Sequence, residues 1–200
     1  LYVGCIASAN SRCAAMERAG FLVDTIYHRM CASDVRLLQP SPLPEGFIIR
    51  PLAGTDDIDT WVRTINAAFA DQHEPTTTST DEKRRQMHLA SYLPTADLVA
   101  LDSDGSLVGI GLGQLKTLED GSLEAWVSRI GLVPSARQRG LGRALLTRTM
   151  LALRDAGHPT IWLTVDTKNE TGALGLYKSA GFEIVYQVVN YVRQVDPLTS

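Results

Sequence analysis

Residues 137–146 read Arg137-Gln138-Arg139-Gly140-Leu141-Gly142-Arg143-Ala144-Leu145-Leu146, and this stretch decides the fold. The segment 126–132 before it alternates and is β-branched or apolar enough to predict a strand. After it, apolar residues recur at helical spacing, at Leu141, Leu145, Met150 and Leu153. We therefore expect a strand, a short glycine-containing turn and a helix that begins near Gly140.

A turn of this kind is suited to binding an anion. The first amides of a helix have no intrahelical partner, and the helix dipole places partial positive charge there. Gly140 and Gly142 lack the Cβ atoms that would keep a bulky anion away from those amides. Positive charge is added by Arg137, Arg139 and Arg143. A pyrophosphate held by the amides from Gln138 to Arg143 is the expected ligand, and a plain basic turn is the alternative.

Two other phosphate-binding loops do not fit the sequence. A Walker loop needs Gly-Lys-Ser/Thr, which is absent, and a dinucleotide fingerprint needs a third glycine where Leu145 stands. The remaining pattern is Arg/Gln-x-x-Gly-x-Gly/Ala, and with Leu132 and Pro134 before it the stretch resembles the acetyl-CoA motif of the GNAT superfamily of N-acetyltransferases. The resemblance implies an α/β fold with a central mixed sheet flanked by helices, and acetyl-CoA as co-substrate.

The pattern of the chain supports this fold class over residues 46–195. We expect strands at 47–52, 98–101, 106–115, 123–132, 160–165 and 182–195, and helices from Asp56-Asp57, over 81–93 before Pro94, and over 140–155 and 171–180. This is the element order of the GNAT fold. Three glycines alternate on one strand face, at Gly109, Gly111 and Gly113, which predicts close packing there by a ligand or a helix.

The first 31 residues suggest a second, partial unit. They are expected to form a strand, a helix, the tripeptide Ala19-Gly20-Phe21 and a second strand. The same order recurs about 160 residues later, around Ala180-Gly181-Phe182. We interpret residues 1–31 as the C-terminal half of a degenerate GNAT-like domain, 32–45 as a proline-rich linker, and 46–200 as a complete acetyltransferase domain; coincidence is the alternative. The start without Met suggests a fragment. The arrangement resembles mycothiol synthase and related two-domain acetyltransferases.

Composition limits the partners. The net charge is −3 and the basic residues gather around the turn, so we expect neither nucleic acid nor membrane as a partner. A DNA-binding role for the arginines is a weaker alternative. Three cysteines, at Cys5, Cys13 and Cys31, fit no zinc spacing, and we expect free thiols, no metal and a cytoplasmic location.

The resemblance also assigns cofactor contacts outside the turn. In the family the pantetheine arm pairs with the strand before the turn, here Ile130-Gly131-Leu132, and Leu132 is the implied N–H donor to the thioester oxygen. Asn169 matches the family's cofactor-binding asparagine, although its distance from Tyr177 is one residue longer than expected. A helix N-cap is the alternative role for Asn169.

Two residues are candidates for proton transfer. Tyr177 lies in Leu176-Tyr177-Lys178-Ser179-Ala180-Gly181-Phe182, which matches the family motif whose tyrosine is the general acid for the leaving thiolate; a tyrosine packed in the core is the alternative. In the first unit Met16 takes this place, so we expect that unit to be catalytically silent. Glu124 is the candidate base, on one strand face with Trp126, Ser128, Ile130 and Leu132, and a solvated strand-end glutamate is the alternative. His73 and Glu74 lie in the expected acceptor loop, and they, like His158, are more simply loop residues.

The resemblance to the GNAT superfamily implies an N-acetyltransferase that moves the acetyl group of acetyl-CoA to a primary amine of a small molecule or peptide by direct attack. A non-catalytic module that binds acetyl-CoA is the alternative. We expect a monomer or homodimer. The acceptor itself is not indicated by any motif.

Overall fold

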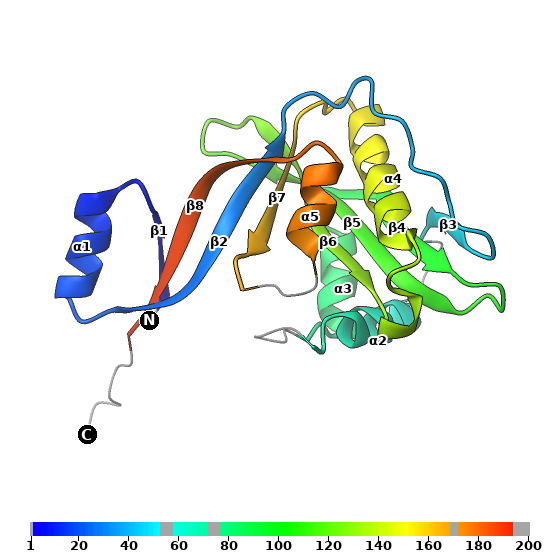
Figure 1. Cartoon of the computed structure of the whole chain (residues 1–200), viewed down its shortest axis with the longest axis horizontal. Coiled ribbons are helices and arrows are strands. Elements are labelled where there is room, and N and C mark those ends of the chain that lie inside the picture. The colour runs from blue at the N-terminus through cyan, green and yellow to red at the C-terminus, as the bar shows by residue number, and fades with distance from the viewer. Residues whose placement is uncertain (1, 53–57, 72–76, 169–171, 194–200) are drawn as a thin grey trace.

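The computed structural model describes residues 2–52, 58–71, 77–168 and 172–193, and these form one eight-stranded sheet with helices on both faces (Figure 1). The strands are β1 (Tyr2–Ile6), β2 (Leu22–Ala32), β3 (Ile48–Pro51), β4 (Tyr92–Leu101), β5 (Leu107–Thr117), β6 (Leu123–Leu132), β7 (Ile161–Asp166) and β8 (Glu183–Val192). The helices are α1 (Asn10–Arg18), α2 (Ile58–Ala68), α3 (Thr80–Met87), the 3-10 turn η1 (Pro134–Ala136), α4 (Leu141–Asp155) and α5 (Ala173–Ser179). The spatial order is β1-β8-β2-β7-β6-β5-β4-β3, and only β6 and β7 run parallel.

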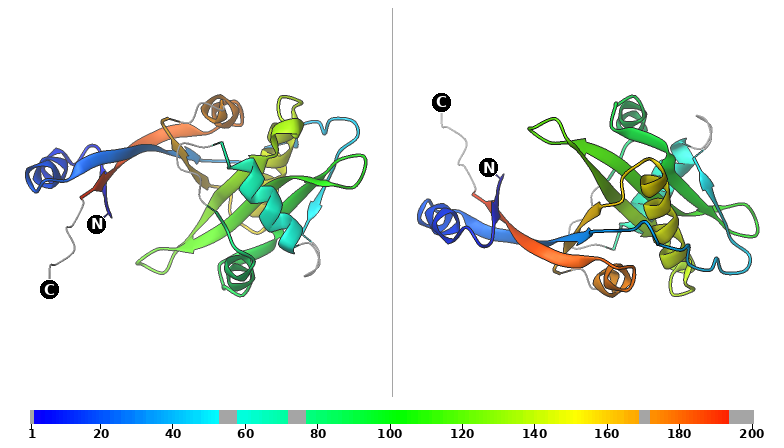
Figure 2. Two further views of the ribbon diagram at one scale, coloured as in Figure 1. Left: turned by 90° about the horizontal axis from the view of Figure 1, so that it is seen from below. Right: turned by 90° about the horizontal axis from the view of Figure 1, so that it is seen from above.

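The helices form two layers around the sheet, as Figure 2 shows. On one face α4 and α5 cover the sheet through a core that includes Leu146, Met150 and Leu163. On the other face α2 packs Trp61 and Ile65 against β5. From β3 to β8 the elements follow the predicted order, so the expected α/β fold with a mixed sheet is confirmed.

One predicted boundary is wrong. The helix expected over 81–93 ends at Met87, and β4 begins at Tyr92, so that Pro94 lies inside a strand. Proline is tolerated there because the ladder with β5 is interrupted between Tyr92 and Asp97 and needs no N–H from residue 94. The expected helix start at Asp56-Asp57 lies outside the described residues.

Two of the three alternating glycines on β5, Gly111 and Gly113, make room for a helix, while Gly109 makes room for the Leu132 side chain of β6. An added Cβ at Gly111 would lie 2.4 Å from Thr149 Oγ1 and 3.1 Å from Leu145 Cγ, both on α4. At Gly113 it would lie 3.0 Å from Leu153 Cγ, one turn further along the same helix. Close approach of α4 is therefore the reason for Gly111 and Gly113.

Replacing Gly111 should destabilise the protein. Gly111→Ala places a methyl group against Thr149, which is fully buried, and overpacking of this kind costs about 1–3 kcal/mol. Gly142→Ala is the matched comparison, because its Cβ would meet nothing closer than 3.6 Å and alanine favours a helix. Urea unfolding should show opposite signs for the two variants, and equal stability of Gly111→Ala and the parent would contradict the packing explanation.

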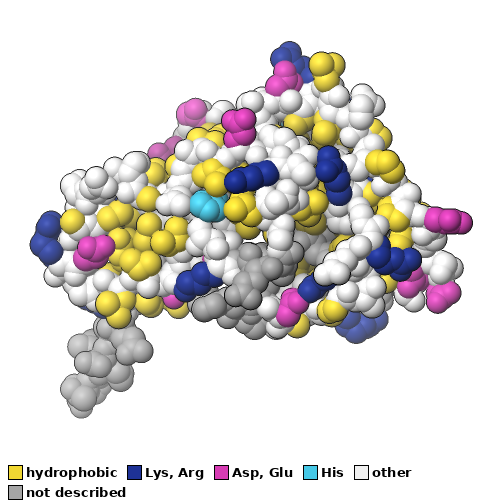
Figure 3. Space-filling model, viewed as in Figure 1, with side chains coloured by type: hydrophobic (Ala, Val, Ile, Leu, Met, Phe, Trp, Pro, Cys, Tyr) yellow, Lys and Arg dark blue, Asp and Glu magenta, His cyan; other side chains and the backbone are white. Residues whose placement is uncertain are grey.

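Residues 2–32 form strand, helix and strand, but they do not stand apart from the rest. β2 lies between β7 and β8, and β8 lies between β1 and β2, all antiparallel. The N-terminal and C-terminal segments therefore interleave in one sheet. Figure 3 shows hydrophobic side chains gathered over the end of the molecule formed by these strands, where Tyr2, Leu22 and Val23 are exposed. Whether residues 1–31 are half of a related domain stays a prediction.

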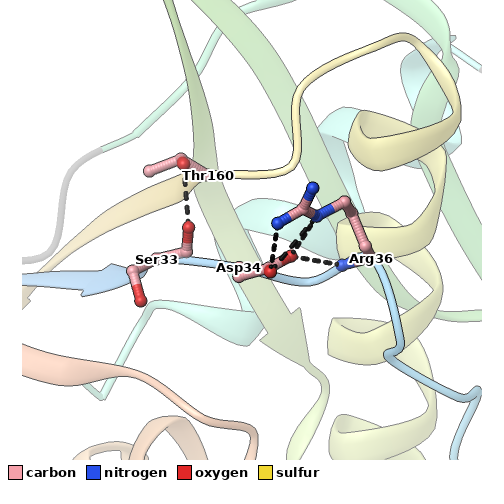
Figure 4. A network of polar contacts seen from close by, with 4 residues as sticks. All are labelled: Ser33, Asp34, Arg36 and Thr160. Carbon is pink, nitrogen blue, oxygen red and sulfur yellow. Dashed lines mark hydrogen bonds and ion pairs between the residues drawn. The ribbon is translucent and has the colours of Figure 1, made fainter.

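The predicted linker is extended and is held against the main body. Ser41 N–H donates to Thr147 Oγ1 (3.0 Å), and the Arg148 guanidinium donates to Ser41 O (2.9 Å). At its start, Thr160 Oγ1 donates to Ser33 O (2.9 Å), next to the local pair of Asp34 and Arg36 (Figure 4). The segment 32–45 is therefore bound to the surface of α4 by hydrogen bonds.

Two further expectations concern the cysteines and membrane-spanning helices. All three cysteines are free thiols, as predicted, with Cys5 buried and Cys13 and Cys31 partly buried. None of the helices in the described ranges is long and apolar enough to cross a membrane.

Candidate functional site

The turn between β6 and α4 forms a backbone cradle. Gly140 has a φ of 81° and caps α4, and Gln138 has a φ of 59°. The first helical hydrogen bond at this end runs from Ala144 N–H to Gly140 O (3.2 Å), so the N–H groups of residues 141–143 have no partner within the helix. These amides can receive a phosphate group.

A side chain at Gly142 would not clash with the rest of the protein. A Cβ added at Gly142 would lie 3.6 Å from Leu132 Cδ1 and 3.8 Å from Leu176 Cδ2, which are ordinary van der Waals distances. Its backbone is helical, so neither packing nor backbone conformation requires a glycine there. Room for a ligand is the remaining physical reason for a small residue.

The three arginines of the turn have different surroundings. Arg137 points inward, donates to Leu132 O (3.1 Å) and Ala68 O (3.0 Å), and forms an ion pair with Asp71. Hydrogen bonds in this pair raise the pKa of Arg137 and lower the pKa of Asp71. The Arg137 side chain therefore joins the turn to α2, and its charge is largely balanced.

The other two arginines leave their charge at the surface. Arg139 is exposed, with its guanidinium 4.6 Å from the ring centre of Phe47. Arg143 is exposed and donates to Ser179 O (2.9 Å) and Ser41 Oγ (3.2 Å). Both can attract a phosphate, because the partners described here, an aromatic ring, a hydroxyl and a carbonyl, leave their charge unbalanced.

Beside the turn, β6 separates from β7. The two strands pair only at Ala125–Ile161 and Trp126–Trp162, although β6 continues to Leu132. Val133 N–H donates to Val108 O on the β5 side (3.0 Å). Because N–H groups alternate between the two edges of a strand, those of Ile130 and Leu132 point to the open edge, and that of Gly131 points to β5. An extended group with amides can pair there.

A β-bulge changes the predicted strand face. Leu112 pairs with Arg129 but Gly113 pairs with Val127, so Ser128 is the extra residue. Ile130 and Leu132 lie opposite Gly111 and Gly109 and face α4. Glu124 and Trp126 lie opposite Lys116 and Gln114 on the other face. The expectation that Glu124 shares a face with Ile130 and Leu132 is wrong, because the bulge reverses the alternation.

Glu124 is also far along the strand from the turn. Eight residues separate it from Leu132, roughly 27 Å at 3.4 Å per residue. Its carboxylate accepts a hydrogen bond from Trp126 Nε1 (3.1 Å). A small amine beside Leu132 cannot contact Glu124 at the same time.

Tyr177 lies on α5, at the edge of the core under α4. Its ring packs edge-on against Phe182, with ring centres 6.2 Å apart. Burial raises the pKa of Tyr177 to about 12, and its hydroxyl forms no hydrogen bond with any other residue that the structure describes. The phenol is therefore protonated at neutral pH and free to donate. Asn169 lies outside the described residues, as do His73 and Glu74.

Sequence reasoning missed a buried polar cluster between α3 and β4. Lys83 Nζ lies 2.5 Å from Asp97 Oδ2, and both side chains are fully buried. Asp97 also accepts hydrogen bonds from Trp61 Nε1 (3.2 Å) and Tyr92 Oη (2.8 Å). Lys83 lies in a polar helix and Asp97 in a strand, and no sequence pattern indicates that the two side chains meet.

Comparison with known proteins points to one family. The profile described as "Acetyltransferase (GNAT) family" matches residues 60–182. A protein named mycothiol acetyltransferase from Thermomonospora curvata is 37% identical over 162 residues, which cover 76% of this chain and 52% of that protein. Its namesake from Propionibacterium freudenreichii is 34% identical over 149 residues, 74% of this chain and 47% of that protein. The chain spans about half the length of these curated relatives.

Solved structures share the fold. A GCN5-related N-acetyltransferase from Sphaerobacter thermophilus matches with a TM-score of 0.76 at 25% identity, covering all of this chain and 63% of that one. A tandem GNAT protein from the clavulanic acid biosynthesis pathway matches with a TM-score of 0.73 at 12% identity, covering 98% of this chain and 64% of that one. At this identity the second match concerns the fold alone.

Proposed function

Because the chain belongs to the acetyltransferase (GNAT) family, we propose that it transfers the acetyl group of acetyl-CoA to a primary amine of a small molecule. The observation that carries this proposal is the position of the free amides of residues 141–143 beside the open edge of β6. The relatives named mycothiol acetyltransferase support a small acceptor over a peptide.

In this proposal the backbone holds the cofactor. The pyrophosphate binds the amides of the turn, with Arg139 and Arg143 beside it, and the pantetheine arm pairs with the open edge of Ile130–Leu132. The amine nitrogen attacks the thioester carbon, and the N–H of Leu132 stabilises the oxyanion that forms. Asn169 remains a proposed cofactor contact on the family resemblance.

Tyr177 is the proposed general acid. When the tetrahedral intermediate collapses, the C–S bond breaks and the sulfur leaves as a thiolate, to which the phenol donates. Burial raises the pKa of Tyr177 to about 12, so the phenol carries the proton that it would donate.

The amine must reach this site uncharged. With an ordinary amine pKa near ~10.4, about one molecule in a thousand is neutral at physiological pH. Glu124 is too distant from Leu132 to take the proton directly, so we assign deprotonation to water, with Glu124 as an electrostatic contributor at most. The rate with a saturating cofactor should then rise with pH toward the amine pKa.

A charged variant of the turn tests the proposal. Gly142→Asp places a carboxylate in the first turn of α4, where it favours the helix, but it repels a pyrophosphate. We expect the affinity for acetyl-CoA to fall at least about tenfold while the melting temperature is unchanged or higher. Calorimetry with acetyl-CoA and release of CoA thiol with an amine panel measure this, and equal affinity of both proteins would overturn the proposed cofactor site.

A non-catalytic acetyl-CoA-binding module is the second candidate. Two observations favour it. The Tyr177 ring packs against Phe182, and Glu124 lies far along β6 from Leu132, the proposed oxyanion donor. Tight acetyl-CoA binding with no CoA thiol released above the uncatalysed rate, over the whole amine panel, would select this candidate.

A further inference from the structure

Arg129 is a half-buried arginine that lines a cavity between β6 and the helices α2 and α3. It follows the bulge at Ser128 and points to the face of β6 covered by α2 and α3, opposite Leu112. It forms neither a hydrogen bond nor an ion pair with any residue in the described ranges, and the ring centre of Phe69 lies 6.0 Å from its guanidinium carbon. Burial lowers the pKa of Arg129. The half-buried guanidinium interacts electrostatically with Glu82 across the cavity, and its N–H groups make no hydrogen bond within the described ranges, so they can donate to a ligand.

A cavity of about 220 Å³ adjoins this guanidinium, lined by Trp61, Thr77, Thr78, Glu82, Gln86 and Arg129, among others. Three other polar side chains of the cavity already have hydrogen-bond or ion-pair partners. The Lys83 ammonium is paired with Asp97, and Gln86 Nε2 donates to Gln114 Oε1 (3.2 Å). The Glu82 carboxylate accepts from Ser79 N–H (2.7 Å) at the start of α3. Arg129 is thus the cation of this cavity that has no ion-pair partner among the described residues.

We propose that this cavity binds a carboxylate of the acceptor amine through Arg129. This inference rests on the proposed function, because it gives the chemical class of the acceptor: a small molecule with both an amine and a carboxylate. The planar guanidinium matches a carboxylate with two parallel hydrogen bonds. A monoanion fits better than a phosphate dianion, because Glu82 contributes a fixed negative charge to the same cavity.

The position of Arg129 fits this role. It lies on the part of β6 beyond the last pair with β7, Trp126–Trp162, where the edge of the strand is open. Leu132, the proposed oxyanion donor, is three residues further, roughly 10 Å along the strand. An acceptor can therefore place its carboxylate under α3 and extend its amine across the open edge to the thioester.

Matched pairs of amines test the inference. The ω-amino acids β-alanine, 4-aminobutyrate and 5-aminopentanoate are compared with propylamine, butylamine and pentylamine, using CoA thiol release by the parent chain, Arg129→Gln and Arg63→Gln. Arg63 is an exposed residue of α2 whose guanidinium donates to Thr60, and serves as the matched control. We expect the parent to prefer the amino acid at least tenfold in kcat/KM for one pair. Arg129→Gln should lose this preference mainly through KM, and Arg63→Gln should keep it.

Binding separates this inference from the proposed function. Calorimetric titration of the same three amino acids should give saturable binding to the parent that weakens at least tenfold in Arg129→Gln, with an unchanged melting temperature. That result without any turnover would refute the proposed function and leave the carboxylate site standing. Turnover without a carboxylate preference, equal preference in Arg129→Gln, or no Arg129-dependent binding of any of these amino acids would overturn the inference.

Discussion

Tyr177→Phe is expected to lower kcat for acetyl transfer by about 10²- to 10⁴-fold, the usual contribution of a positioned general acid. The variant removes one oxygen and keeps the ring that packs against Phe182, so the core should be unchanged. Binding of acetyl-CoA should also be kept, since the turn and the edge of β6 do not involve the phenol. The measurement is CoA thiol release at saturating cofactor, with calorimetry for binding.

The pH profile adds an independent check of Tyr177. Because its pKa is raised to about 12, the phenol stays protonated throughout the range from pH 7 to 10, and the parent should show no loss of kcat there from its ionisation. Tyr2→Phe, at an exposed tyrosine far along the sheet, is the matched control and should keep full activity. A kcat for Tyr177→Phe within twofold of the parent would show that Tyr177 is only a core residue.

The sequence predicted the fold through short-range signals. Apolar periodicity and glycine turns are local, so the element order from β3 to β8 and the start of α4 beside Gly140 could be read directly. The end of α3 could not be predicted in this way. Pro94 predicts the end of that helix, but it lies inside β4, where the pairing with β5 is interrupted. Proline restricts both structures, and only the pairing of β4 with β5 distinguishes them.

The details of the site depend on contacts that no local pattern encodes. A bulge at Ser128 reverses the faces of β6, and nothing in the sequence around it marks the extra residue. Arg137 fits a cofactor motif, yet its side chain is bound by Asp71 and Ala68, which are remote in sequence. The insertion of β2 between β7 and β8 is also a long-range pairing. Residue types at the site could be predicted, and their partners could not.

Lys83→Met is expected to destabilise the protein by about 3–5 kcal/mol, because it leaves the Asp97 carboxylate buried without its cation. Asp97→Asn should cost a similar amount by leaving the Lys83 ammonium unpaired. Urea unfolding measures both. Arg84→Met is the matched surface control: the Arg84–Asp81 pair is exposed, with 3.5 Å between its charged atoms, and its loss should cost less than about 1 kcal/mol.

The double variant distinguishes a buried charge from lost contacts. In Lys83→Met with Asp97→Asn no buried charge remains. Trp61 Nε1 and Tyr92 Oη donate to different oxygens of the Asp97 carboxylate, so in the variant the asparagine oxygen can accept from Trp61 Nε1 while its NH2 group donates to the Tyr92 hydroxyl. The two costs should therefore not add, and the double variant should be more stable than either single one by at least about 1 kcal/mol. Additive losses would mean that the pair acts through its packing on Trp61 alone. Since α3 carries Glu82 and Gln86 to the Arg129 cavity, the single variants should also loosen that cavity, and the double variant should restore it.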